Sequence, residues 1–280
     1  MVTRYITNFL VTFLIISSKQ NLYSIICEMT HSSDKQVEHD RYEIRASSIL
    51  ACSDPLPECE LPLELQSPYK YFAKLIGELS LSPNSRVLEI GAGTGALTTV
   101  LLKTGAFVIA SDISVNSLRL LFSRLKSLGK LKTQVADMEC LPFGNEEFDL
   151  VTSAGSLSYG DSKVVMQEIY RVLKPGSAFV CVDSLNHNPI YRVNRWVQYL
   201  QGKRTKSTMV QMPTVSTMQR YKSKFGEIHV KFFGSLVWLS PFLRLIFGTR
   251  NTAIMIDAFD SYITVRRSAF KFVMIAVKRI

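Results

Sequence analysis

The chain has 280 residues, of which 47% are hydrophobic, so it is long and apolar enough to bury a large core. It carries 33 Lys and Arg against 23 Asp and Glu, and this formal net charge of +10 favours anionic partners. The five cysteines form no C-x-x-C pair and the four histidines no H-x-x-x-H pair, which argues against a disulfide framework and against a metal site.

The first 28 residues form an apolar extension. Residues 5–16 are apolar apart from Thr7, Asn8 and Thr12, and they are too few for the roughly 20 apolar residues that span a bilayer. A weak signal peptide is one interpretation, but no clean cleavage site follows. The extension is otherwise a loose segment that touches a membrane, or it reflects a start codon assigned too early, with Met29 as the true start.

Residues 29–68 are predicted to be a lid or a linker. The spacing of apolar residues predicts a short amphipathic helix over residues 40–50. Four prolines between residues 52 and 68 exclude a continuous helix there, and helical spacing returns over residues 69–81.

The sequence VLEIGAGTG, residues 87–95, predicts a buried strand, a tight turn and a helix that runs to Gly105. Gly91, Gly93 and Gly95 suit a turn in which side chains would block a ligand from the backbone. In open α/β folds, ligands bind in the crevice at the carboxyl ends of the strands. We therefore predict a ligand site at this turn.

Two ligands fit the glycine turn. With Ala96 it matches the loose dinucleotide pattern G-x-G-x-x-G/A, which would make the protein a nicotinamide-dependent oxidoreductase. Glu89 argues against this, because its charge would face a pyrophosphate at short range. The same charge favours an ammonium and a sulfonium, as in S-adenosylmethionine (SAM). In the alternative interpretation, Glu89 only caps local backbone groups.

Acidic residues follow the next two predicted strands. Residues 107–110 lead to Asp112 and its neighbour Ile113, and an acid at this place can accept hydrogen bonds from both ribose hydroxyls. Asp112 could instead cap the next helix, a role that Ser114 could also fill. After the strand at residues 132–136, Asp137 and Met138 suit an adenine, whose amine the carboxylate would bind.

The two strands that come next complete the parallel part of the sheet. Residues 148–152 lead to Ser153 and two small residues, which leave room for a methyl donor, and residues 178–182 form a fifth buried strand. Strands that alternate with helices in this way predict a parallel sheet with right-handed crossovers.

In this order, the motifs VLEIGAGTG, SDIS, ADMECLPF, EEFDLVTSAGSLSYG and LKPGSAFVCVD resemble those of the class I SAM-dependent methyltransferases, in the type 11-like group of small-molecule and quinone-type enzymes. The resemblance covers residues 69–183, and it departs from the pattern at Ser177, where a glycine is frequent. Two segments, DRYEIRA and residues 186–208, are loosely similar to methyltransferases associated with bacterial surface polysaccharides.

The resemblance implies an α/β, Rossmann-like class I methyltransferase fold: a seven-stranded, mostly parallel sheet with an antiparallel last strand and helices on both faces. The methyltransferase domain would cover residues 69–280. The resemblance further implies that the cofactor is contacted by Glu89, Gly91, Gly93, Gly95, Asp112 and Asp137.

Residues 184–226 are predicted to be a basic insertion on the substrate side. They contain no acid but eight basic residues: Arg192, Arg195, Lys203, Arg204, Lys206, Arg220, Lys222 and Lys224. Because the segment follows the fifth strand, we expect it to cover the mouth of the site. It would favour a phosphorylated or nucleotide-linked sugar, a lipid-linked glycan or an acidic membrane surface. A solvated basic face without such a role is the alternative, and RNA is disfavoured because no RNA-binding module is present.

The end of the chain is predicted to complete the sheet in antiparallel orientation. A strand is expected at residues 227–233, an apolar helix broken by Pro241 at residues 236–247, and a long strand at residues 270–278.

These features predict a cytoplasmic enzyme, in solution or held at a membrane surface, that methylates a small-molecule or glycan acceptor at oxygen. A hydroxyl acceptor needs a base, for which His187, Tyr159 and Asp161 are the candidates because they follow the fourth and fifth strands. A degenerate methyltransferase that binds SAM to regulate a partner, and an RNA methyltransferase, are the alternatives.

Overall fold

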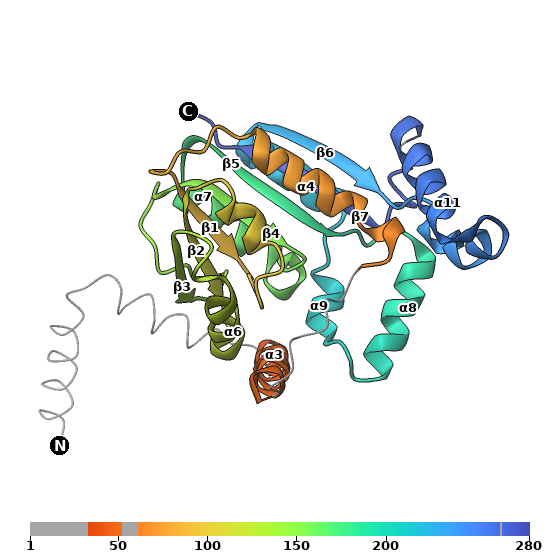
Figure 1. Ribbon diagram of the computed structural model, residues 1–280, viewed down its shortest axis with the longest axis horizontal. Helices are drawn as coiled ribbons and strands as arrows, with labels where there is room; N and C mark the ends of the chain where they lie inside the picture. The colour runs from red at the N-terminus through yellow and green to blue at the C-terminus, as the bar shows by residue number, and fades with distance from the viewer. Residues whose placement is uncertain (1–32, 52–60, 264) are drawn as a thin grey trace, which may run out of the picture.

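The computed structural model describes residues 33–51, 61–263 and 265–280. Its centre is a seven-stranded sheet in the order β3-β2-β1-β4-β5-β7-β6 (Figure 1). Strands β1 to β5 pair in parallel, and β7 is antiparallel to both of its neighbours, β5 and β6. The predicted fold class, with its mostly parallel sheet and reversed last strand, is thereby confirmed.

The strands are β1 (Arg86–Ile90), β2 (Phe107–Asp112), β3 (Leu131–Val135), β4 (Phe148–Ala154), β5 (Leu173–Ser184), β6 (Glu227–Phe233) and β7 (Lys271–Val277). The α-helices are α3 (Ser33–Ala51), α4 (Ser67–Glu78), α5 (Thr98–Leu102), α6 (Val115–Leu125), α7 (Ser162–Val172), α8 (Pro189–Leu200), α9 (Lys206–Val210), α10 (Val215–Phe225) and α11 (Ser240–Tyr262). Short 3₁₀ helices are η1 (Leu63–Leu65), η2 (Leu157–Tyr159) and η3 (Val237–Leu239).

Helices cover both faces of the sheet, because successive side chains of a strand point to opposite faces. On β1, Val87 packs into a core with α4, α5 and α6, while Leu88 and Ile90 pack into a second core with α7 and α10. Phe179 and Tyr221 are stacked in the second core with ring centroids 5.6 Å apart. The sheet is therefore the middle layer of three.

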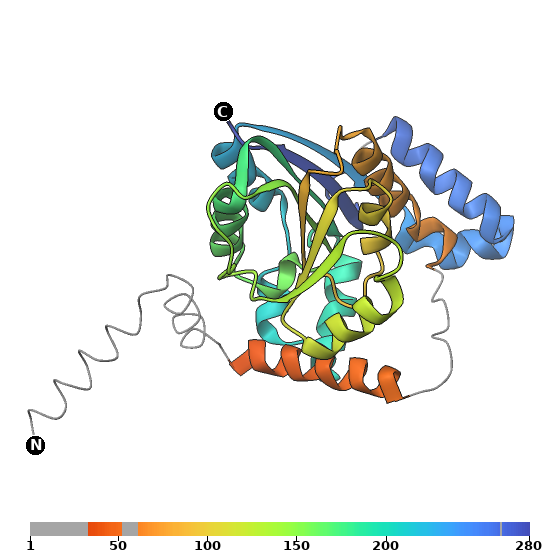
Figure 2. The same ribbon diagram turned by 60° about the vertical axis from the view of Figure 1, so that its left-hand side comes forward.

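Helix α3 lies apart from these two layers. It runs across one end of the sheet (Figure 2) and packs against α6. Polar contacts fix it to the loop before α9 and to α9 itself: the Thr205 hydroxyl donates to Glu38 over 2.9 Å, and the Ser207 N–H donates to Asp34 over 2.9 Å. The end of the sheet that α3 covers is the carboxyl end of β1 to β4.

Several elements differ from the sequence-based prediction. Helix α3 is 19 residues long, so it begins well before the predicted residue 40. Helix α5 has only five residues and ends before Gly105. Pro241 does not break the apolar helix but lies in the first turn of α11, where a missing N–H costs nothing; the kink is at Gly248. Residues 1–28, and the linker at residues 52–60, lie outside the described residues.

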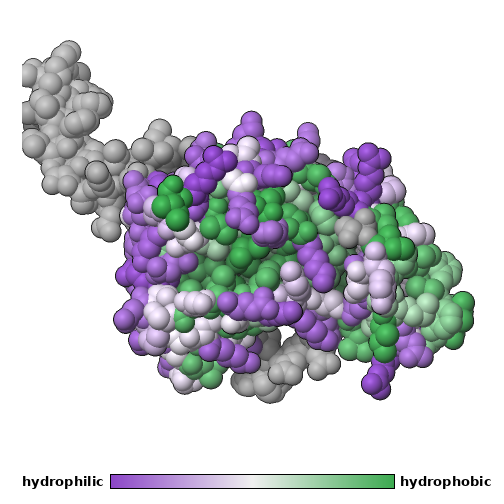
Figure 3. Space-filling model, turned by 90° about the horizontal axis from the view of Figure 1, so that it is seen from above, coloured by the Kyte–Doolittle hydropathy of each residue, from purple (hydrophilic) through white to green (hydrophobic). Residues whose placement is uncertain are grey.

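The hydrophobic residues of α11 gather on the surface at one end of the molecule (Figure 3). Leu245 and Ile246, in the first half of this helix, are 85% and 73% exposed. Among the helices that the structure describes, none is both long and apolar enough to cross a bilayer.

The two-sided core makes a direct stability prediction. Phe179 is 0% exposed, and we expect Phe179→Ala to lower the free energy of unfolding by about 3–5 kcal/mol, because it removes the ring and leaves a cavity. Phe242→Ala, at a ring that is 67% exposed on α11, is the matched control and should change it by less than about 0.5 kcal/mol. Urea unfolding measures both, and equal effects would contradict the assignment of the core.

Candidate active site

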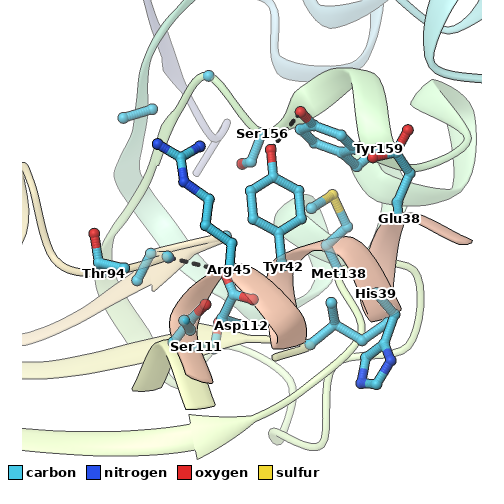
Figure 4. A pocket seen from close by; sticks show the side chains of 18 of the residues that line it. Glu38, His39, Tyr42, Arg45, Thr94, Ser111, Asp112, Met138, Ser156 and Tyr159 are labelled. Atoms are coloured by element: carbon cyan, nitrogen blue, oxygen red, sulfur yellow. Dashed lines mark hydrogen bonds between the residues drawn. The ribbon is translucent and has the colours of Figure 1, made fainter. Parts of the chain in front are cut away.

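A cavity of about 590 Å³ opens at the carboxyl ends of β1 to β4, beneath α3 (Figure 4). The loops after these four strands supply its floor, and α3 supplies its roof. The α3 side chains that line it recur every three or four residues, which is one face of a helix. They are Lys35, Glu38, His39, Tyr42, Arg45, Ala46 and Ile49.

The glycine turn forms one wall of the cavity. All three glycines have positive φ, at 63° for Gly91, 53° for Gly93 and 88° for Gly95. A Cβ on Gly91 would lie 2.3 Å from the Cβ of Ser156, whereas a Cβ on Gly93 would meet no atom within 4 Å. Gly91 is therefore required by packing, and Gly93 leaves open space beside the backbone. Gly95 does not line the cavity but packs against α6.

Asp112 ties the glycine turn to the end of β2. Its Oδ2 accepts a hydrogen bond from the Gly93 N–H over 2.8 Å, and its Oδ1 accepts one from the Ser114 N–H over 2.9 Å. Burial raises the pKa of Asp112, while these backbone donors lower it. The N-cap of α6 is Ser114, so Asp112 does not fill that role. Asp112 and Ile113, two of the residues predicted to contact the cofactor, both line the cavity.

Asp137 and Met138 also line the cavity, at the end of β3. The Asp137 carboxylate accepts the Glu139 N–H over 2.9 Å and is paired with the Lys35 ammonium of α3, which also binds Glu139 over 2.8 Å. Burial lowers the pKa of Lys35, but the hydrogen bonds to the two carboxylates raise it above its usual value. This ion-pair cluster anchors the first turn of α3 to the floor of the cavity.

Glu89 lies within β1 and is not on the cavity wall. It is 3% exposed, and its Oε2 accepts the Thr98 hydroxyl of α5 over 2.6 Å. Burial raises the pKa of Glu89 to about 7, and the bond from Thr98 opposes that shift. The structure thus shows Glu89 joining β1 to α5 through a side chain, rather than facing the cavity or capping backbone groups.

Ser153 lies behind the cavity wall. It is buried and shares a 2.7 Å hydrogen bond with the Ser156 hydroxyl, which donates to the Ile90 carbonyl over 3.1 Å. Ser156 itself lines the cavity together with the small residues Ala154 and Gly155. Ser153 therefore supports the wall without reaching the interior.

Of the three predicted catalytic residues, only Tyr159 lines the cavity. Its hydroxyl shares a 2.6 Å hydrogen bond with the hydroxyl of Tyr42, and the two rings meet edge to face with centroids 5.6 Å apart (Figure 4). Burial, with Tyr42 beside it, raises the pKa of Tyr159. The phenol is therefore protonated at neutral pH and can donate a hydrogen bond to a ligand.

His187 and Asp161 are placed elsewhere. The Nε2 of His187 accepts the Val215 N–H over 2.9 Å at the start of α10. Asp161 is the N-cap of α7 and accepts the N–H groups of Lys163 and Val164 over 2.9 and 3.1 Å. Neither residue lines the cavity, and each has a local role in starting a helix.

Residues 184–226, which we expected to cover the mouth of the cavity, lie beside it in the structure. The cavity wall contains no residue of this segment. Its helices flank the site, and residues 202–207 hold α3 in place through Glu38, Asp34 and a 3.2 Å bond from Arg41 to the Gly202 carbonyl. The roof comes from α3, whose spacing indicates a helix but not where that helix packs.

Over the described ranges, no group of three or more His, Cys, Asp or Glu side chains is arranged to hold a metal ion.

Comparison with known proteins gives a family match over part of the chain. Residues 88–181 match the family model of a methyltransferase domain. An uncharacterized protein of Mycobacterium tuberculosis is 36% identical over 104 residues, which are 36% of this chain and 38% of that protein. The demethylmenaquinone methyltransferase of the same species is 34% identical over 115 residues, 40% of this chain and 47% of that enzyme. The matches thus span less than half of these relatives.

Solved structures of methyltransferases align with a larger part of the chain. A geranyl diphosphate C-methyltransferase from Streptomyces coelicolor has a TM-score of 0.57 at 16% identity, over 89% of this chain and 99% of that one. A phosphoethanolamine N-methyltransferase from Haemonchus contortus has a TM-score of 0.53 at 16% identity, over 81% and 62%. At these identities the likeness concerns the fold.

The reversed β7, the glycine turn tied to Asp112 and the match at residues 88–181 agree with one another: this part of the chain is similar to a methyltransferase domain, and the fold is that of the solved methyltransferase structures.

Proposed function

We propose that the cavity binds SAM and that the protein transfers the methyl group of SAM to a small-molecule acceptor. The observation that carries the proposal is the Asp112 carboxylate, which lines the cavity while it fixes the glycine turn through the Gly93 N–H. Asp112 would accept the ribose hydroxyls, and Asp137 with Met138 would hold the adenine. When bound, SAM supplies a methyl group on an electron-poor sulfonium.

The cavity fits this ligand. Its glycine wall leaves open space at Gly93, and its volume of about 590 Å³ is typical of sites for small organic ligands. Asp137 already holds the Lys35 ammonium, so an adenine amine would share this carboxylate with α3. Methyl transfer is a displacement along one line, so the protein contributes mainly by orienting the acceptor and by excluding water.

For the acceptor we propose an anionic small molecule or glycan that is methylated at oxygen. Besides Lys35, which is paired with Asp137 and Glu139, the cavity wall carries the guanidinium groups of Arg45 and Arg124, which favour an anionic group. The Tyr42 and Tyr159 hydroxyls would orient an acceptor oxygen by hydrogen bonding. The Streptomyces neighbour is described in complex with geranyl diphosphate, which is an anionic small molecule.

Cofactor binding is tested with S-adenosylhomocysteine. We expect Asp112→Ala to weaken its binding at least about tenfold, because the variant loses both the ribose acceptor and the bond to Gly93. Glu227→Ala, at an exposed carboxylate on β6, is the control and should bind as the wild type does. Calorimetric titration measures both proteins. Equal affinity for the two variants, or binding of NAD instead, would refute the site.

The buried carboxyl of Glu89 predicts a pH-dependent stability. Because burial raises its pKa from 4.5, the ordinary value for a glutamate, to about 7, the folded form binds an extra proton between these values, and stability falls as the pH rises through this window. We expect Glu89→Gln to keep the bond from Thr98 and to raise the free energy of unfolding by about 2–3 kcal/mol at pH 8, but by little at pH 5. Urea unfolding at both pH values checks this, and a gain independent of pH would contradict it.

The tyrosine pair predicts a separation of turnover from cofactor affinity. Tyr159→Phe removes only the hydroxyl, and we expect kcat/KM for methyl transfer to fall about tenfold while S-adenosylhomocysteine affinity is retained. Tyr170→Phe, at a ring that packs on Phe225 away from the cavity, is the matched control. Release of S-adenosylhomocysteine with a panel of phosphorylated sugars and hydroxylated acids measures turnover. If the Tyr159→Phe enzyme is as active as the control, the Tyr42–Tyr159 pair has no role in turnover. If the protein binds SAM but methylates no acceptor of the panel, a regulatory role is favoured.

A further inference from the structure

Helices α8 and α9 carry an exposed apolar surface, which we call the α8–α9 surface. On α8 the exposed residues Ile190, Val193, Val197 and Leu200 recur every three or four positions, and Trp196 lies beside them. Val193 is 63% exposed, and Val210 at the end of α9 is 75% exposed. This face points away from both cores, because none of these residues belongs to either.

The charges around this surface have one sign. No acid occurs in residues 184–226, and Arg192, Lys203 and Lys206 are exposed among the apolar side chains. The acids that approach from α3 are already engaged: Glu38 binds Arg41 and Thr205, and Asp34 binds the Ser207 N–H. An amphipathic helix with Trp and aliphatic residues between Lys and Arg is typical of helices that lie in a membrane interface.

A groove beside α8 adds a buried cation. Arg192 and Arg195 line this groove of about 590 Å³, together with Val193, Trp196, Met209 and Val210. Arg195 is only 6% exposed, and its Nη1 donates to the Leu185 carbonyl over 3.1 Å and to Asn186 over 3.3 Å. Among the described residues, the buried Asp183 carboxylate interacts with Arg195 electrostatically, but no carboxylate lies within 4.0 Å of its guanidinium. A buried guanidinium usually has an anionic partner.

We propose that the α8–α9 surface binds an anionic lipid bilayer, with a lipid phosphate in the groove at Arg192 and Arg195 and the apolar side chains at the boundary of the acyl chains. The apolar part of the groove suits the glycerol and first methylenes of a lipid. This inference does not depend on methyl transfer.

Two other assignments fit less well. RNA would use the cations and could stack on Trp196, but the exposed aliphatic residues of α8 offer nothing to bases. The exposed hydrophobic residues of α11 form another apolar surface, but its Arg244 is paired with Glu64 and its second half contains Asp257. Of these two apolar surfaces, the α8–α9 surface is the one that combines exposed aliphatic residues, exposed cations on a segment without acids, and a buried guanidinium that lines a groove.

The position of this surface links it to the active site. Thr205, between α8 and α9, binds Glu38 of α3, and Glu38 lines the cavity. Helix α9 also packs against η2, which contains Tyr159. A bilayer at the α8–α9 surface would therefore lie beside the roof of the cavity, where an acceptor carried on a lipid could be presented.

The test uses the full chain and sedimentation with vesicles of phosphatidylglycerol and phosphatidylcholine, or of phosphatidylcholine alone. We expect binding only to the anionic vesicles, and a loss of at least about tenfold in the double variant Val193→Glu/Leu200→Glu. The double variant Leu245→Glu/Ile246→Glu, at equally exposed residues of α11, is the matched control and should bind as the wild type does. Circular dichroism and the thermal midpoint confirm that both variants are folded.

Fluorescence gives a second readout. The chain has two tryptophans, so Trp238→Phe leaves Trp196 as the reporter, and its emission should shift to the blue on anionic vesicles.

Arg192→Gln should weaken vesicle binding, and inorganic phosphate should compete with the vesicles. The proposal is overturned if the α8 variant binds as the wild type does or if the α11 variant loses binding instead. It is also overturned if phosphate or single-stranded RNA binds and anionic vesicles do not.

Discussion

The Asp112 carboxylate is the contact on which the site depends. One of its oxygens accepts the Gly93 N–H of the turn after β1, and the other accepts the Ser114 N–H at the start of α6. Two loops and a helix are therefore held in one geometry by a single buried side chain at the end of β2. Backbone N–H groups use part of the hydrogen-bonding capacity of this carboxylate, and the remaining part faces the cavity. Asp112 therefore fixes the cavity wall and can also accept a hydrogen bond from a ligand.

The roof of the cavity is built on a different principle. Helix α3 contributes few apolar side chains to either core, and polar contacts hold it instead: Lys35 on Asp137 and Glu139, and Glu38 and Asp34 on residues 205–207. The basic segment 184–226 thus holds α3 in place through the side that faces this helix. On its outer side it is a surface without a partner in the described chain.

The sequence predicted the sheet well because its signals are local. A glycine or an acid lies at the end of each of β1 to β4 or within two residues after it, so Gly91, Asp112 and Asp137 could be assigned to one edge of the sheet from the pattern alone. The position of α3 over the cavity could not be predicted. Lys35 and Asp137 are 102 residues apart, and nothing in the sequence around either residue indicates that the two form an ion pair. Likewise, His187 follows β5 in the sequence, but only the fold shows that it starts α10 instead of reaching the cavity.

The polar attachment of α3 separates access to the cavity from the stability of the protein. These hydrogen bonds and ion pairs lie outside the two cores, and opening one helix costs less free energy than unfolding the whole protein. The roof can therefore open in a local transition while the three layers stay folded, and its amide protons will exchange with solvent on their own timescale. Mutations deep in the sheet and mutations in the polar contacts of α3 thus act on two separate properties of one molecule, its lifetime and the rate at which ligands enter.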